Sequence, residues 1–233
     1  MDVNLGTAFI WFVVFLFSTT VHEAMHAFVA WKGGDPTAYH GGQVSLSPIP
    51  HVRREPLGML AVPLLTALTS GWPIGWASAP YDPVWAERHP ARATVMAAAG
   101  PAGNFAIAAV AFIVLKAGLF AGWFVAPDHV TLGALVEAAD GGVMGFAAAL
   151  LSTCLMLNVL LGTFNLLPLP PLDGGAVFSF FLPEKARTSI NTLQSNGAFS
   201  FIGLMVAWQI APVFTDPLFS LVLRLLHPDV PYD

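Results

Sequence analysis

The stretch that decides the fold is His22-Glu23-Ala24-Met25-His26, which lies inside an apolar run from Val3 to Trp31. Residues four apart share one face of a helix, so His22 and His26 can bind one metal ion together while Glu23 acts as a base toward metal-bound water. Inserting an ionisable side chain near the centre of a membrane helix costs about 2.5 to 3.5 kcal/mol, so a cluster of three indicates a common function. Binding a metal ion is the simplest such function; a hydrogen-bonded histidine pair without metal is the alternative.

The composition indicates an integral membrane protein. Hydrophobic residues make up 56% of the chain, charged residues 10%, and the mean hydropathy is +0.69. Soluble domains carry roughly 25% charged residues, so much of this surface must face lipid. The net charge of -5 offers no basic patch, which excludes nucleic-acid binding. The single cysteine, Cys154, excludes an intramolecular disulfide framework and a cysteine-based zinc site.

The apolar segments predict an all-α polytopic membrane protein. Spans of about 20 residues suffice to cross a bilayer, so three helices are expected to form the core, over Val3–Trp31, Thr94–Leu115 and Val143–Leu167. One or two further membrane segments are expected over 198–226. We expect a single integral-membrane domain over 1–233, with its core over 3–182.

Two segments have weaker patterns. Gln43-Val44-Ser45-Leu46-Ser47 alternates polar with apolar residues and predicts a short strand or β-hairpin. Leu57–Ala79 is apolar but interrupted by prolines and glycines, so it could span, re-enter or lie at the surface. Hydropathy alone does not choose among these.

A third metal ligand is expected beside another interrupted helix, in the stretch from Asn165 to Gly175. Its three prolines forbid a continuous helix, and non-helical backbone at membrane depth must line protein or a wet cavity. Asp173 would then face that site. Two histidines and one carboxylate leave a fourth position of zinc open for water, as in catalytic sites. Alternatively, Asp173 caps a helix that begins at Gly174 or Gly175.

Three separated motifs together resemble the site-2 proteases, a family of intramembrane zinc metalloproteases. They are, in the family's order, His22-Glu23-Ala24-Met25-His26, Gly100-Pro101-Ala102-Gly103-Asn104 and Leu172-Asp173-Gly174. Gly34-Asp35-Pro36-Thr37-Ala38 and Pro50-His51 are most similar to small bacterial members without a PDZ domain. The sequence departs from such members at Gln43, Ser47 and Ser78, where Arg, Asn and Lys are expected.

The resemblance implies a zinc metalloendopeptidase with one Zn²⁺ per chain, bound by His22, His26 and Asp173, with Glu23 as the catalytic base. Asn104 and Asn165 would help to position substrate or support the site; alternatively, Asn104 bridges helices and Asn165 satisfies backbone freed by Pro168. Transmembrane proteins in the bilayer would be the substrates, and Gly41–Ser47 would hold them as an edge strand.

Two other functions remain open. A catalytically inactive membrane adaptor could keep the same fold, but zinc binding alone does not require Glu23. A metal transporter would need polar groups on both sides of the site, whereas Phe9–Phe17 is purely apolar.

Topology adds a constraint, because His26 and Asp173 must reach one metal ion at one membrane depth. If Leu57–Ala79 crossed fully, three crossings would separate these two residues and place them on opposite faces. We therefore expect that segment to re-enter or lie at the surface. Seven of the nine basic residues then lie on the active-site side, namely Lys32, Arg53, Arg54, Arg88, Arg92, Lys185 and Arg187, against Lys116 and Arg224. The positive-inside rule makes that side the cytoplasmic face of the bacterial cell membrane.

Overall fold

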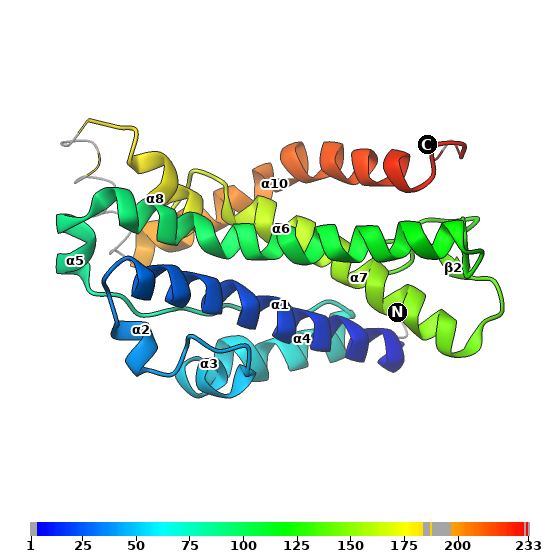
Figure 1. Cartoon of the computed structure of the whole chain (residues 1–233), viewed down its shortest axis with the longest axis horizontal. Helices are drawn as coiled ribbons and strands as arrows, with labels where there is room; N and C mark the ends of the chain where they lie inside the picture. The colour runs from blue at the N-terminus through cyan, green and yellow to red at the C-terminus, as the bar shows by residue number, and fades with distance from the viewer. Residues whose placement is uncertain (1–3, 184–186, 188–196, 231, 233) are drawn as a thin grey trace.

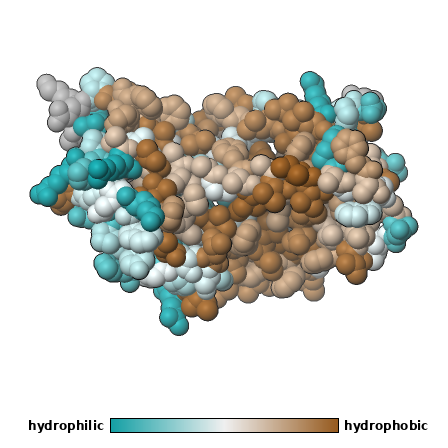
Figure 2. All heavy atoms as spheres, in the orientation of Figure 1, coloured by the Kyte–Doolittle hydropathy of each residue, from teal (hydrophilic) through white to brown (hydrophobic). Residues whose placement is uncertain are grey.

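A computed structural model of the chain describes residues 4–183, 187, 197–230 and 232. Within these ranges four helices are long and apolar enough to cross a membrane: α1 (Leu5–Lys32), α6 (Pro90–Phe120), α7 (Gly142–Asn165) and α10 (Gly197–Leu226). They run along the long axis of the molecule (Figure 1), and apolar side chains form a broad band between more polar ends (Figure 2). The predicted all-α polytopic membrane fold is confirmed.

Three of these helices form the core. α6 packs against both α1 and α7, and α10 packs mainly against α7.

Asn4 caps the start of α1, where its Oδ1 accepts a hydrogen bond from the Thr7 amide at 3.1 Å. α10 continues through Pro212 and Pro217, so the one or two segments expected over 198–226 form a single helix.

The segment after α3 (Pro48–Arg54) enters the apolar band and returns. A π-helical turn, η1 (Leu57–Ala61), leads into α4 (Val62–Ser70), which ends at Gly71 in the left-handed conformation with a φ of 76°. The irregular chain then runs back beside η1, where the Trp76 amide donates to the Gly58 carbonyl at 3.0 Å. It reaches α5 (Pro83–Arg88) at the end of the molecule where α1 finishes (Figure 1). This path doubles back on itself, as a re-entrant segment does, and among the described helices of membrane-spanning length only α6 and α7 lie between His26 and Asp173.

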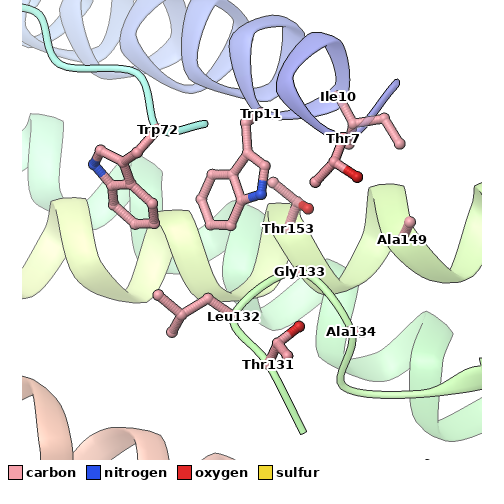
Figure 3. Close-up of a pocket in the computed structure, with 10 residues that line it drawn as sticks. All are labelled: Thr7, Ile10, Trp11, Trp72, Thr131, Leu132, Gly133, Ala134, Ala149 and Thr153. Atoms are coloured by element: carbon pink, nitrogen blue, oxygen red, sulfur yellow. The ribbon is translucent and has the colours of Figure 1, made fainter. Parts of the chain in front are cut away.

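The tip of this re-entrant segment packs against the N-terminal half of α1. The rings of Trp72 and Trp11 are 4.4 Å apart. They line a cavity of about 500 Å³ between α1, α7 and the loop at 131–134 (Figure 3). None of the ten lining residues is a histidine, cysteine or acid, so this cavity is separate from the predicted metal site.

The small β-element is present, but not where the alternating pattern predicts it. The sheet pairs β1 (Phe124–Val125) with β2 (Glu137–Ala138) in antiparallel register, at the end of the molecule opposite α5. Residues 41–47 instead form turns and bends between α2 (Thr37–His40) and α3.

The prediction of a strand at Gln43–Ser47 is wrong because serine side chains bind the local backbone. Ser47 caps α3, with its Oγ accepting from the Ile49 amide at 3.4 Å, and Ser45 Oγ accepts from the Ser47 amide at 3.1 Å. Such bonds compete with the pairing of strands. The edge-strand role expected for Gly41–Ser47 therefore has no structural basis.

Candidate metal centre

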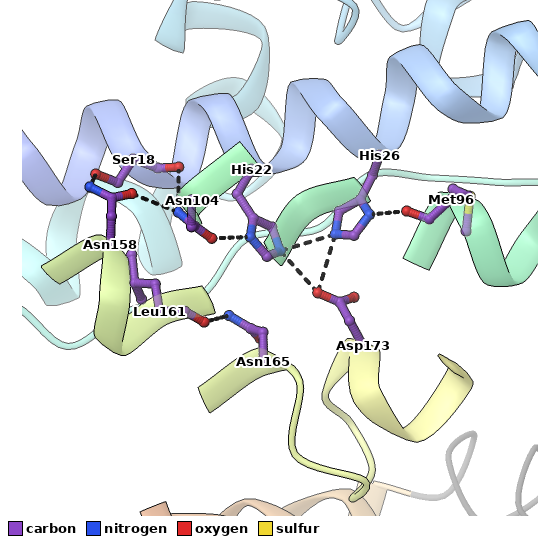
Figure 4. Close-up of polar contacts among 9 residues, drawn as sticks. All are labelled: Ser18, His22, His26, Met96, Asn104, Asn158, Leu161, Asn165 and Asp173. Atoms are coloured by element: carbon purple, nitrogen blue, oxygen red, sulfur yellow. Dashed lines mark hydrogen bonds and ion pairs between the residues drawn. The ribbon is translucent and has the colours of Figure 1, made fainter. Parts of the chain in front are cut away.

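The structure brings His22, His26 and Asp173 into contact. The two histidines lie one turn apart on α1, and their Nε2 atoms are 3.0 Å from each other. Asp173 Oδ2 lies 3.1 Å from His22 Nε2 and 3.4 Å from His26 Nε2 (Figure 4). Both histidine residues are 7% exposed. The three atoms that the sequence proposes as ligands therefore converge on one buried point.

The second nitrogen of each ring sets the tautomer. His26 Nδ1 lies 2.7 Å from the Met96 carbonyl oxygen, which can only accept, so Nδ1 carries the proton. His22 Nδ1 lies 2.6 Å from Asn104 Oδ1 and likewise donates. In the neutral rings both Nε2 lone pairs then point toward the carboxylate, as in metal-binding histidines held by a second hydrogen bond.

This arrangement fits a metal ion. Asp173 Oδ2 is buried and accepts no hydrogen bond from the residues that the structure describes. In the neutral tautomers above, the two nitrogens beside it carry no proton. Two lone pairs and a carboxylate oxygen in such proximity require a positive charge among them. Two imidazoles and one carboxylate are a donor set typical of catalytic zinc.

Gly100 provides the space on the side of α6. A Cβ atom at this position would lie 2.3 Å from His26 Nε2 and 2.5 Å from His22 Nε2. Any other residue would therefore fill the point where the ligand atoms converge. The first glycine of the Gly-Pro-Ala-Gly-Asn motif keeps that point accessible to an ion.

Glu23 lies next to the histidines without contacting them as closely as Asp173 does. It is 6% exposed, and its carboxylate lies within 4.8 Å of a ring nitrogen of both His22 and His26. The Glu23 carboxylate is thus beside the histidines, where it could reach a water molecule on an ion held by the other three side chains.

The chain reaches Asp173 through the proline-rich break that the sequence predicts. α7 ends at Asn165, residues 166–172 form turns and bends, and α8 (Asp173–Ser179) begins at Asp173 itself. The N-cap residue is Leu172, and no side chain caps the helix. The capping alternative for Asp173 is therefore not supported, since its carboxylate faces the histidines instead.

The two asparagines predicted to position substrate lie in different environments. Asn104 is 0% exposed and contacts His22, a placement that suits site support, and a contact of Asn104 with substrate stays a prediction. Asn165 donates from Nδ2 to the Leu161 carbonyl at 3.0 Å and does not contact the histidines (Figure 4). A role of Asn165 toward substrate stays a prediction.

Sequence reasoning missed two groups that support the site. The backbone carbonyl of Met96 carries no signal in a sequence. Asn158 does carry one, because a polar amide in the middle of an apolar span needs a partner. It forms hydrogen bonds with Asn104, Ser18 and the Cys154 carbonyl, at 2.8 Å each.

Membrane-spanning helices around a buried His-Glu-His cluster define a membrane metalloprotease. The chain belongs to peptidase family M50, the site-2 protease family, whose model matches residues 10–209. Zinc is the metal that membership implies, and His22 and His26 of the His-Glu-His cluster lie close enough together to bind one ion.

Curated relatives agree with this assignment. YwhC of Bacillus subtilis, a proposed zinc metalloprotease, is 28% identical over 224 residues, which cover 93% of this chain and 92% of YwhC. Rip2 of Mycobacterium tuberculosis, also a proposed zinc metalloprotease, is 32% identical over 90% of this chain and 70% of its own length. No solved structure matches the chain significantly.

Proposed function

We propose that this metalloprotease cleaves transmembrane protein substrates inside the bilayer, near the cytoplasmic side of a bacterial cell membrane. His22, His26 and Asp173 hold one zinc ion, Glu23 is the catalytic base, and residues 1–233 act as one domain. The observation that carries the proposal is the convergence of two unprotonated Nε2 atoms and one carboxylate oxygen within 3.4 Å of one another. These atoms lie between helices long enough to cross a membrane.

Each side chain has a distinct part in the proposed reaction. Glu23 accepts a proton from the attacking water and passes it to the leaving amine. The Met96 carbonyl and Asn104 hold the two imidazoles in the tautomer that presents Nε2. When bound, zinc lowers the pKa of a coordinated water toward about 7 and polarises the scissile carbonyl. A substrate helix must unwind before cleavage, because its carbonyls are otherwise held in its own hydrogen bonds.

The distribution of basic residues supports the cytoplasmic orientation. Lys32, Arg53, Arg54, Arg88 and Arg92 belong to the end of α1, to α3, to α5 and to the start of α6, all toward the end of the molecule that carries α8 (Figure 1). Lys116 and Arg224 lie near the opposite ends of α6 and α10. Lys185 lies outside the described residues. By the positive-inside rule, the α8 end is cytoplasmic.

The central test compares the parent with Glu23→Gln in bacterial membranes. We expect new cleavage sites within transmembrane segments when the parent is expressed. Glu23→Gln should reduce cleavage by about 10²- to 10⁴-fold, the contribution of a general base, while its zinc content stays at one ion per chain. The measurements are mass spectrometry of membrane peptides and metal analysis of the purified protein. The exposed Glu87→Gln is the matched control and should behave as the parent.

Asp173→Ala separates the ligand from the base. This variant should lose zinc as well as cleavage, whereas Asp140→Ala in the exposed outer loop should lose neither. Equal cleavage by parent and Glu23→Gln would contradict the assignment of the base. Metal flux into liposomes without any cleavage would favour a transporter.

A further inference from the structure

A chain of hydrogen bonds between side chains connects the backbone of α7 to His22. Asn158 Nδ2 donates to the Cys154 carbonyl at 2.8 Å, and Asn104 Nδ2 donates to Asn158 Oδ1 at 2.8 Å. Asn104 Oδ1 then accepts from His22 Nδ1 at 2.6 Å (Figure 4). Both asparagines are 0% exposed, so water does not substitute for any partner in the chain.

The polarity of this chain is set at its α7 end. A backbone carbonyl can only accept, so the Cys154 oxygen requires the NH₂ group of Asn158 on its side. Asn158 Oδ1 must then face Asn104 and take a hydrogen bond from its NH₂ group. This leaves Asn104 Oδ1 toward His22, where only a protonated Nδ1 can donate. Each step excludes the flipped amide, because flipping would oppose two donors or two acceptors.

We infer that Asn158 is a positioning residue of the metal centre: anchored on Cys154, it orients the Asn104 amide and thereby keeps the Nε2 lone pair of His22 available to metal. This inference rests on the proposed function and extends it to a residue that does not contact the ligands. His26 needs no such relay, because the Met96 carbonyl accepts from its Nδ1 directly.

Without Asn158 the Asn104 amide loses its main constraint. Its NH₂ group would retain only the Ser18 carbonyl, at 3.5 Å, which is the limit of a hydrogen bond. A flipped Asn104 would donate to His22 Nδ1 and move the ring proton to Nε2. The ring would then present a proton where the metal requires a lone pair.

The first experiment measures zinc affinity by competition with a chelator in the purified full-length protein. Asn158→Leu keeps a side chain of similar volume and removes the amide. It should bind zinc about 10- to 100-fold more weakly, which is the usual effect of losing a residue that supports the metal ligands through hydrogen bonds. The visible spectrum of its Co²⁺ form should shift as well. The control is Ser152→Ala on the same helix, which removes an equally buried hydrogen bond to the Leu135 amide. It should lower the unfolding temperature without changing zinc affinity.

The second experiment separates orientation from general packing. An aspartate at 104 can only accept, so it holds the proton of His22 on Nδ1 whatever residue occupies position 158. The double variant Asn104→Asp/Asn158→Leu should therefore bind zinc more tightly than Asn158→Leu alone. A purely structural role predicts the reverse, with the two losses adding. If Asn158→Leu does not fold, the smaller Asn158→Val takes its place in both experiments.

The outcomes distinguish the relay from the function on which it rests. Zinc affinity of Asn158→Leu equal to that of the parent, or a double variant no tighter than the single one, overturns the relay alone. A parent protein that binds no zinc overturns the proposed function. Weaker binding by Asn158→Leu with recovery in the double variant establishes the relay.

Discussion

The two halves of α1 differ sharply in how they are held. The N-terminal half, which is the outer half in the proposed orientation, packs through apolar side chains. Its Trp11, Val14 and Phe15 form one cluster with Leu157 of α7. The inner half buries polar groups, from Ser18 to His26, and holds them with directed hydrogen bonds. Packing tolerates small shifts, whereas a hydrogen-bonded ligand set does not. The outer half of α1 therefore fixes the helix by packing, and the inner half carries the metal-binding side chains.

The same division extends to α6. Its outer part places Leu115 in the main apolar cluster, while its inner part presents Gly100 and Asn104 to the histidines. Changes in the outer half should therefore alter stability and leave zinc affinity unchanged. Changes in the inner half should alter zinc affinity, whatever they do to stability.

The largest effect is expected from Gly100→Ala. The added methyl group would lie 2.3 Å and 2.5 Å from the two Nε2 atoms, so it should displace the ion. Zinc binding should weaken by more than about 100-fold, which exceeds the usual effect of losing a residue that hydrogen-bonds to a metal ligand. The metal-free fold should also weaken, because the two hydrogen-bonded rings must shift to admit the methyl group. The better helix propensity of alanine, about 1 kcal/mol, offsets part of that cost. Chelator competition and thermal unfolding measure the two quantities.

Gly145→Ala on α7 is the matched control for that substitution. Nothing lies within 4 Å of a Cβ at this position, so stability should stay equal or rise by about 0.4 to 1 kcal/mol. Zinc affinity should not change. Tight zinc binding by Gly100→Ala would show that the ion lies elsewhere.

A smaller effect, on stability alone, is expected from Leu115→Ala in the outer half. Leu115 is 0% exposed, and removing a buried leucine side chain costs about 2 to 5 kcal/mol. Denaturant unfolding in detergent micelles measures the loss, and the zinc affinity of the folded variant should equal that of the parent. Val110→Ala on the same helix, where the side chain is 62% exposed, should change stability by less than about 0.5 kcal/mol. A parallel loss of zinc affinity in Leu115→Ala would show that the two halves are coupled.

Much of the fold follows from the sequence because a membrane span is set by the length of an apolar run. The run Val3–Trp31 predicts α1 to within two residues at its start and one at its end. The strand at Gln43–Ser47 could not be excluded in the same way, since alternation does not reveal that Ser45 and Ser47 bind nearby backbone amides. The re-entrant path of Leu57–Ala79 needed the parity argument as well as hydropathy.

The candidate site was predictable where it depends on spacing within one element. His22 and His26 share a face because of the helical repeat, and Asp173 follows a proline break that opens toward them. A role of Asn104 at the site was expected from its motif, but its contact with His22 was not, because that contact depends on how α6 is rotated against α1. The contact between Asn158 and Asn104 likewise depends on the register of two helices, which no periodicity specifies.

The smallest effect concerns the polar end beyond the site, where Asp35 connects the start of α2 to the residue before α5. Its carboxylate accepts from the Thr37 amide at 2.9 Å, the Thr37 hydroxyl at 2.5 Å and the Asp82 amide at 2.8 Å. Burial alone would raise the pKa of Asp35, but these hydrogen bonds outweigh it and hold the pKa below the ordinary value of 3.8.

Because folding lowers the pKa of Asp35, its ionised carboxylate stabilises the folded protein. This stabilisation is fully present when the pH is above the ordinary pKa of the carboxyl, and it is lost as the pH falls through the lower pKa of the folded state. Asp35→Asn should therefore destabilise the zinc-free protein by about 1.5 kcal/mol at pH 7, and the difference from the parent should shrink at pH 3 and below. Thermal unfolding across this pH range measures it, with the exposed Asp140→Asn as control. A stability difference between Asp35→Asn and the parent that stays constant with pH would show that Asp35 acts through packing. The polar end would then be held by packing, as the outer half of α1 is.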